Sequence, residues 1–370
     1  MSPLGVGLLS GGLTLLLSLV LPFAVKPLLV RLGIMDVPNE RSSHERPVLR
    51  GLGLAVLIAM AAGGIAAIAL FATRGWRGHG VWDVLLVIVG SSLLAGLLGL
   101  AEDLRGLSVK VRSAALLLIA AGSAVGVLLA VQRSDEAVDF GFVGGDASFG
   151  WSAYAPFGAL PLWASILLVV YAVLFISSYI NVANFMDGLN GISGLHGVIA
   201  GLTFAASGWF VAQPWLIAAG LVLAAGFGGF LPWNLTKPGA FLGDVGSYLL
   251  GGATAITSFA ALLYGVPLLA TIGPMVIYFG DVAVTLVKRV RAGHKWDEPH
   301  KEHAYQRIQQ LGYSHVAASA LAAGCTLLTS VLGLAACFAG LRGTVALFVA
   351  GLAVLVFYLL LPRMLPRRAA

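Results

Sequence analysis

The segment 181–191 places amide and carboxylate side chains at the end of a strongly apolar stretch. These side chains are Asn181, Asn184, Asp187 and Asn190. Polar groups beside a membrane span are energetically costly and are usually kept for function. A carboxylate here suits a metal ion, and the amides offer hydrogen bonds that would fix a sugar or a nucleotide. We therefore predict a membrane enzyme.

Two adjacent acids, Glu102 and Asp103, end another apolar stretch. Adjacent residues on a helix point roughly 100° apart, so we do not expect both side chains to serve one atom. One acid would meet a cation while the other meets a substrate; alternatively, both are solvated at the helix end. Lys110 follows after a short loop, where it would hold phosphate oxygens or anchor the span among lipid headgroups.

Asp244 lies in the glycine-containing segment 241–247, which opens a further apolar stretch. Glycine lets the backbone approach a ligand closely, and Mg²⁺ prefers one or two carboxylates with substrate phosphates completing its coordination. We predict that Asp244 is a magnesium ligand and that Asp187 acts in the same way. The alternative for Asp244 is N-capping, since an acid in a first turn complements the helix dipole.

The longest polar segment, at about 291–313, contains His300 and His303. Their spacing puts both on one face of a helix, as a zinc site would require, but there is no clear third ligand. Contacts to a diphosphate or a sugar fit this pair better than zinc does.

Composition sets the fold class. The chain is 59% hydrophobic and 10% charged, whereas a soluble domain carries about 25% charged residues. Continuous apolar runs favour helices over a β-barrel, and roughly 20 residues are needed for each crossing. We predict an all-α polytopic membrane protein that forms a single domain over residues 1–370. Its eleven expected spans are 3–30, 51–72, 81–101, 110–131, 160–180, 191–211, 214–231, 240–262, 265–290, 314–339 and 343–362.

Most of the 22 basic residues fall in loops on one side of these spans. Because Lys and Arg near span ends favour the cytoplasm, that side should be cytoplasmic. An odd number of spans then places the N-terminus outside and the C-terminus in the cytoplasm. This topology accounts for the net charge of +6, so nucleic acid is not an expected partner.

The ordered set of motifs resembles the polyprenyl-phosphate N-acetylhexosamine-1-phosphate transferases of glycosyltransferase family 4. That family includes the translocase of peptidoglycan synthesis and enzymes that initiate O-antigen and teichoic acid synthesis. The similarity covers a core of about 30–315. The matching segments are 36–44, Glu102-Asp103, 181–191, 232–234, 241–247 and 300–307.

The resemblance implies ten or eleven helices and an active site on the cytoplasmic face of the bacterial inner membrane. It implies transfer of a sugar 1-phosphate from a UDP-N-acetylhexosamine-type donor to undecaprenyl phosphate, with release of UMP and dependence on Mg²⁺ or Mn²⁺. Membrane lipids would surround the protein, and a homodimer is compatible with it.

Carried over by motif, the catalytic residues are Glu102, Asp103, Asp187 and Asp244, with Asp244 and Asp187 as metal ligands. The expected substrate contacts are Arg41, His44, Lys110, Asn181, Asn184, Asn190, Asn234, Asp281, His300, His303 and Arg307.

The chain departs from the family pattern at three places. Glu102 stands where relatives usually have Asp, which extends that carboxylate by one methylene, and Asn190 stands where many carry Asp. The run from Arg50 to Gly53 stands where relatives often have consecutive glycines. The segments 184–188 and 303–307 are most similar to the branch that starts O-antigen or exopolysaccharide chains.

Two other classes are alternatives. A secondary transporter or lipid flippase also has helices interrupted by glycine, but its polar groups should lie near the bilayer midplane. In this chain they gather at one side of the expected spans. A non-catalytic scaffold of a polysaccharide assembly complex would be compatible with the departures at Glu102 and Asn190.

Overall fold

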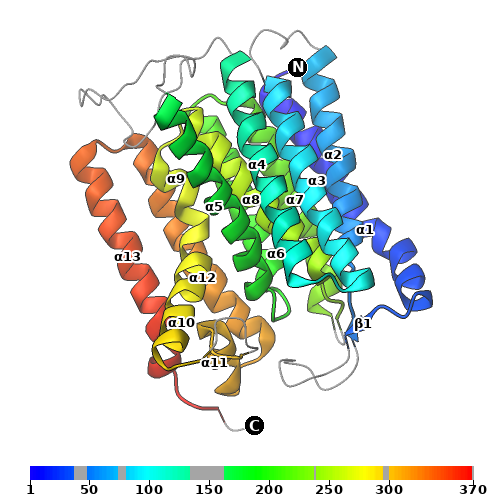
Figure 1. Cartoon of the computed structure of the whole chain (residues 1–370), viewed down its shortest axis with the longest axis vertical. Coiled ribbons are helices and arrows are strands. Elements are labelled where there is room, and N and C mark those ends of the chain that lie inside the picture. Colours follow the sequence, from blue (N-terminus) through cyan, green and yellow to red (C-terminus); the bar gives the residue numbers. More distant parts are fainter. Residues whose placement is uncertain (37–47, 74–80, 134–161, 237–238, 295–299, 369–370) are drawn as a thin grey trace.

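The computed structural model describes residues 1–36, 48–73, 81–133, 162–236, 239–294 and 300–368, which form a bundle of long helices (Figure 1). Its helices are α1 (Pro3–Arg31), α2 (Gly53–Thr73), α3 (Val81–Arg105), α4 (Val109–Arg133), α5 (Leu162–Met186), α6 (Ile192–Phe210), α7 (Pro214–Leu235), α8 (Gly243–Leu263), α9 (Leu268–Ile272), η3 (Gly273–Met275), α10 (Val276–Arg291), α11 (Ala304–Gln310), α12 (His315–Ala335), η4 (Ala336–Phe338) and α13 (Leu341–Met364).

The helical membrane fold is confirmed. Among the described residues, ten helical segments are long and apolar enough to cross a membrane, with α9, η3 and α10 forming one of them. The eleventh expected span is α6, a helix of 19 residues whose glycines, serines and His196 make it less apolar than the others. The count of eleven therefore stays a prediction. Figure 1 places the two ends of the chain at opposite ends of the bundle, as an odd number of crossings requires.

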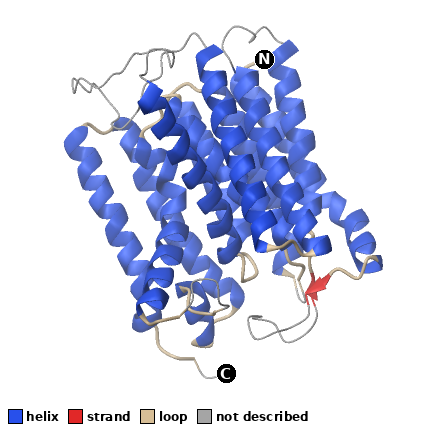
Figure 2. Cartoon of the chain, in the orientation of Figure 1, coloured by secondary structure: helices blue, strands red, loops and turns tan. Residues whose placement is uncertain are grey.

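A small β structure interrupts the all-helical pattern at the end of the bundle that also carries α11 (Figure 2). Strands β1 (Met35–Asp36) and β2 (Val48–Leu49) pair antiparallel. The chain then follows segment 240–242: the Phe241 N–H donates to the Leu49 carbonyl at 2.8 Å, and the Gly53 N–H donates to the Leu242 carbonyl at 2.9 Å. These bonds fix the backbone around Arg50 beside the start of α8.

Helix α8 is the centre of the bundle, because its most apolar stretch is entirely buried. Two glycines let α3 approach it closely. A Cβ atom at Gly99 would lie 2.1 Å from the Asp244 carbonyl oxygen, and one at Gly96 would lie 3.3 Å from the Val245 carbonyl oxygen. The close approach brings Asp103, one turn beyond Gly99, to the first turn of α8.

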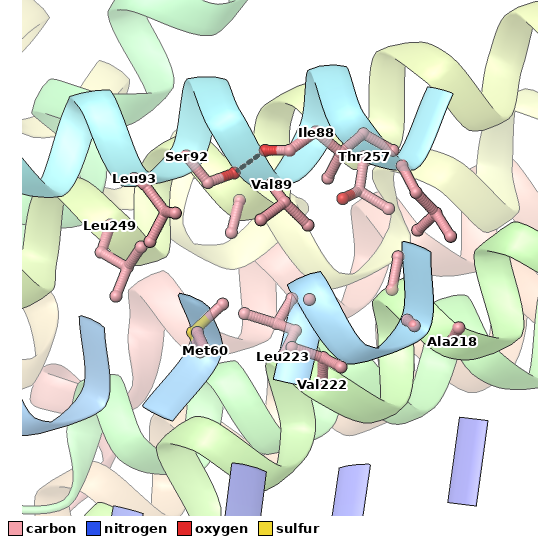
Figure 3. A pocket seen from close by; sticks show the side chains of 15 residues that line it. Met60, Ile88, Val89, Ser92, Leu93, Ala218, Val222, Leu223, Leu249 and Thr257 are labelled. Atoms are coloured by element: carbon pink, nitrogen blue, oxygen red, sulfur yellow. Dashed lines mark hydrogen bonds between the residues drawn. The ribbon is translucent and has the colours of Figure 1, made fainter. Parts of the chain in front are cut away.

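A small cavity of about 30 Å³ lies inside the bundle between α2, α3, α7 and α8 (Figure 3). Its lining is almost wholly aliphatic. The hydroxyl of Ser92, one of its few polar groups, already donates to the Ile88 carbonyl at 2.6 Å. We therefore treat it as a packing defect rather than a substrate site.

The contact at Gly99 generates a stability prediction. Gly99→Ala should lower the melting temperature of the detergent-solubilised protein, because the added methyl group forces α3 away from α8; overpacking of this kind costs about 1–3 kcal/mol. Gly90→Ala is the matched control, since a Cβ atom there meets nothing within 4 Å. Equal melting temperatures for the two variants would contradict the proposed packing.

Candidate active site

The Asp103 carboxylate binds the N-terminus of α8 from the neighbouring helix. It accepts hydrogen bonds from the backbone N–H groups of Asp244 at 3.1 Å and Val245 at 2.9 Å. Its side chain is only 1% exposed. A carboxylate in this position satisfies donors that the helix cannot pair and complements the helix dipole. The geometry therefore gives Asp103 a positioning role, and its predicted catalytic role stays a prediction.

Asp244 points out of the same turn and is held by two neighbours. Its Oδ1 accepts a hydrogen bond from Asn184 Nδ2 at 2.8 Å, and its Oδ2 lies 2.9 Å from Arg50 Nη2. Arg50 Nε in turn lies 3.0 Å from Asp103 Oδ1, so the guanidinium bridges two carboxylates. The Asp244 side chain keeps 17% of its surface exposed, which leaves it accessible to a ligand.

Asp187 lies in the loop between α5 and α6, where Ser193 Oγ donates to its Oδ1 at 2.6 Å. Burial raises the pKa of this carboxyl from 3.8 to about 7; the negative charge of Asp244 acts in the same direction, and Arg50 opposes it. These couplings place Asp187 in one electrostatic site with Asp103, Asp244 and Arg50. The site combines three carboxylates with an arginine that pairs with two of them.

This donor set fits the kind of metal site that a substrate completes. Among the described residues, no three His, Cys, Asp or Glu side chains form a group that could hold a metal by themselves. Mg²⁺ commonly takes only one or two protein carboxylates, with phosphates and water supplying the rest. The accessible Asp244 and the half-buried Asp187 suit that arrangement. Their role as metal ligands stays a prediction.

Glu102 faces away from Asp103, in line with the angle between adjacent helical residues. Its Oε2 accepts a hydrogen bond from the Leu107 N–H at 3.0 Å, and its Oε1 lies 3.4 Å from Arg112 Nη1. The side chain is 14% exposed. Lys110 is exposed nearby. This acid and these bases lie next to the carboxylate site but do not share atoms with it.

Several of the predicted amide contacts hold the backbone instead. Asn190 Oδ1 lies 2.9 Å from His315 Nδ1, and Asn234 Nδ2 donates to the Ala240 carbonyl at 2.9 Å. The Asn234 side-chain oxygen also accepts the Gly191 N–H. Asn181 donates to a carbonyl of its own helix. These bonds tie the loop after α5 to α7 and α12, and substrate contact by these residues stays a prediction.

Asp281 is a second buried anchor. It is 0% exposed and accepts both the Ala304 N–H, at 3.0 and 3.1 Å, and the Tyr358 hydroxyl, at 2.7 Å. His303 Nδ1 lies 3.3 Å from the same carboxylate. This arrangement gives Asp281 the task of holding the start of α11, and we find no exposed surface on it for the predicted substrate contact.

Helix α11 brings the histidine segment against the end of α5. The Tyr305 hydroxyl donates to the Phe185 carbonyl at 3.0 Å, next to Asp187, and the His300 and His303 rings lie 4.9 Å apart. Burial, followed by the charges of His303 and Arg289, lowers the pKa of His300 to about 4, so this ring is neutral near pH 7. Arg307 is partly exposed on the same helix.

Arg41 and His44 lie outside the described residues. Sequence reasoning noted Arg50 only as a departure from a glycine pattern and did not select it as a site residue. The sequence feature that could have indicated Arg50 is its position as a basic residue directly before Gly51. In the structure, the Gly51 backbone is left-handed, with φ +88°. Ser193, which bonds Asp187, carried no recognisable signal.

Known proteins match this site region. Residues 85–262, which include most of α3, the end of α5 and nearly all of α8, match the sequence model of Glycosyl transferase family 4. Over these residues, just under half of the chain, the sequence is similar to glycosyl transferase family 4. The family region contains Glu102, Asp103, Asp187 and Asp244, and it ends before α10 and α11.

Two relatives agree with this match. A probable undecaprenyl-phosphate N-acetylglucosaminyl 1-phosphate transferase of Bacillus subtilis (strain 168) is 28% identical over 305 residues, which cover 82% of this chain and 77% of that protein. A decaprenyl-phosphate N-acetylglucosaminephosphotransferase of Mycobacterium leprae (strain TN) is 34% identical over 101 residues, 24% of this chain and 25% of that protein. The predicted resemblance is confirmed.

The raised pKa of Asp187 generates a prediction for the protein without metal. Because its folded pKa of about 7 exceeds 3.8, ionisation is costlier in the folded state, and stability should be lost as pH rises from about 4 through 7. Asp187→Asn mimics the protonated acid. In EDTA, its melting temperature should exceed that of the wild type by clearly more at pH 8 than at pH 5, because most of the ionisation cost appears between these values; an equal offset at both values would contradict this prediction.

Proposed function

We propose that the protein transfers a sugar 1-phosphate from a UDP-sugar to undecaprenyl phosphate. The sugar is an N-acetylhexosamine or a deoxy derivative of one. The products are undecaprenyl-diphosphate-sugar and UMP. The observation that carries the proposal is the grouping of Asp103, Asp187 and Asp244 with Arg50 at one end of a membrane bundle. The names of the Bacillus subtilis and Mycobacterium leprae relatives support the same class of reaction.

In the proposed reaction, an oxygen of the lipid phosphate attacks the β-phosphorus of the UDP-sugar. A new phosphorus–oxygen bond forms there, and the bond from that phosphorus to the bridging oxygen breaks, so that UMP leaves with the electron pair. When bound, Mg²⁺ or Mn²⁺ would neutralise part of the negative charge on the lipid phosphate and the diphosphate. Asp244 and Asp187 would hold the ion.

The protein's own contribution is positioning and charge. Asp103 fixes the first turn of α8, and Asn184 orients the Asp244 carboxylate through its 2.8 Å hydrogen bond. Tyr305 holds the histidine segment against the end of α5, and neutral His300 could donate a hydrogen bond to a sugar or phosphate oxygen. Phosphoryl transfer asks mainly for such placement, because little covalent chemistry falls to the protein.

We propose a one-step transfer. The alternative is a two-step route through a phosphorylated aspartate. Incubation with a UDP-sugar carrying a radiolabelled β-phosphate, without lipid, should leave the protein unlabelled; a trapped covalent adduct would contradict the one-step route.

Charge supports a cytoplasmic active site in the inner membrane. Arg105 ends α3 on the side that carries Asp103, and Lys110 and Arg112 follow in α4. Further basic residues end α10 near the histidine segment. Positive residues near span ends favour the cytoplasmic side. The N-terminus would then lie on the opposite side of the membrane, outside the cytoplasm. Segments 184–188 and 303–307 are most similar to the O-antigen and exopolysaccharide branch of the family. This similarity supports a role in the first membrane step of one of these pathways.

The arrangement favours an enzyme over a transporter. Asp103, Asp187 and Asp244 lie where α3 and α5 end and α8 begins, at one end of the bundle. The small cavity inside the bundle is apolar, whereas a transporter binds its substrate near the midplane through polar groups.

The direct test is UMP release by purified protein given undecaprenyl phosphate, Mg²⁺ and a panel of UDP-sugars. At least one donor should yield UMP together with a lipid-linked sugar. Asp244→Asn should reduce turnover by at least about 10²-fold, because it removes the charge at the accessible acid while preserving its shape. Release of UMP by none of the donors, or unchanged turnover in a folded Asp244→Asn protein, would refute the proposal.

A further inference from the structure

Arg50 is held at its backbone, while its side chain is partly exposed. The strand-like bonds from Phe241 to Leu49 and from Gly53 to Leu242 fix the chain on either side of it. Its side chain is 36% exposed, far more than the Asp103 and Asp244 side chains with which it pairs, at 1% and 17%. Because the backbone is fixed and the side chain is partly exposed, the guanidinium can change partners without movement of the fold.

The two carboxylates that Arg50 bridges are not equivalent. Asp103 is buried and also accepts two backbone N–H groups, so its contact with Arg50 Nε lies in the protected part of the site. The contact of Nη2 with Asp244 Oδ2 is at the accessible edge. Arg50 can thus release Asp244 and stay attached to Asp103.

We propose that Arg50 is an exchangeable counter-charge. In the empty site it neutralises Asp103 and Asp244; when a divalent cation binds Asp244, the Nη end of Arg50 leaves that acid and binds a phosphate oxygen of the donor's diphosphate. This inference rests on the proposed function for the identity of the donor. It assigns to Arg50 both competition with the metal and recognition of the substrate.

Electrostatics supports the exchange. A guanidinium at 2.9 Å from Asp244 Oδ2 occupies the space that a cation ligated by that oxygen would need, and the two positive charges would repel each other. A guanidinium turned towards a diphosphate instead gains a charge-assisted contact, which is often bidentate because its fork matches phosphate oxygens. The same residue therefore serves the empty and the loaded site.

A purely structural role makes a different prediction. If Arg50 only braced Asp103 against Asp244, its loss would disorder both acids and weaken metal binding and donor binding together. An exchangeable counter-charge makes the two affinities change in opposite directions. Opposite signs are a result that simple damage to the site does not produce.

The experiment uses full-length protein in detergent and measures two affinities. Mn²⁺ binding without substrate is followed by the electron paramagnetic resonance signal of free Mn²⁺, and UDP-N-acetylglucosamine binding at saturating Mn²⁺ is followed by calorimetry. Arg50→Gln should bind Mn²⁺ roughly tenfold more tightly and the nucleotide sugar roughly tenfold more weakly, each corresponding to about 1.4 kcal/mol. If another donor is accepted in turnover, it replaces UDP-N-acetylglucosamine.

Arg105→Gln is the matched control. It removes the same charge from the exposed last turn of α3, two residues beyond Asp103, and should change neither affinity by more than about twofold. Arg50→Lys keeps the charge but cannot bridge both acids, so its Mn²⁺ affinity should lie between those of the wild type and Arg50→Gln. It also provides the same comparison if Arg50→Gln does not fold.

Weaker or unchanged Mn²⁺ binding in Arg50→Gln would overturn the competition, and unchanged donor affinity would overturn the recognition of diphosphate. A wild-type protein that neither binds nor turns over any UDP-sugar would refute the proposed function instead. The Mn²⁺ measurement would still decide whether Arg50 competes for Asp244, so the two failures can be told apart.

Discussion

Asp103 binds the first turn of α8 from a neighbouring helix, and the geometry of the site depends on that interaction. Its carboxylate accepts the N–H groups of Asp244 and Val245, and Gly99 lets the two helices approach closely enough for these bonds to form. The direction in which Asp244 leaves α8 is thereby fixed. Asn184 and Arg50 then reach its two oxygens from α5 and from the chain after β2.

A second buried carboxylate holds the start of another helix in the same way. Asp281 of α10 accepts the N–H of Ala304 at the start of α11, and α11 in turn places Tyr305 against the end of α5 beside Asp187. Two buried carboxylates thus hold the starts of two helices, while Asp187 and Asp244 keep surface for a ligand. A buried acid whose oxygens accept hydrogen bonds from N–H groups fixes the backbone that donates them, and it thereby restricts the movement of the neighbouring acids.

The sequence predicted the helices well, because each span is a continuous apolar run whose length is fixed by the thickness of the bilayer. It also selected Asp187 and Asp244, since an acid beside an apolar run is costly without a function. It did not separate these from Asp103 and Asp281, because only the neighbouring helix shows that the latter pair cap N-termini. Asn190 and Asn234 are similar cases, since their partners lie far away along the chain.

Arg50 shows why such a site cannot be read from motifs alone. Its importance comes from hydrogen bonds between segment 49–53 and segment 240–242, which join parts of the chain that are distant in sequence. The resulting grouping carries more carboxylate than guanidinium charge, and such a site attracts a cation. In the proposed reaction, such a cation would let two anions, a lipid phosphate and a nucleotide diphosphate, approach each other without prohibitive repulsion.

The most direct measurement is the rate of UMP release by the purified protein with undecaprenyl phosphate and an accepted UDP-sugar, first in excess EDTA and then during titration with Mg²⁺. We expect no release in EDTA and full recovery as free Mg²⁺ rises. A full rate in EDTA would contradict the central claim that these acids act through a bound divalent cation.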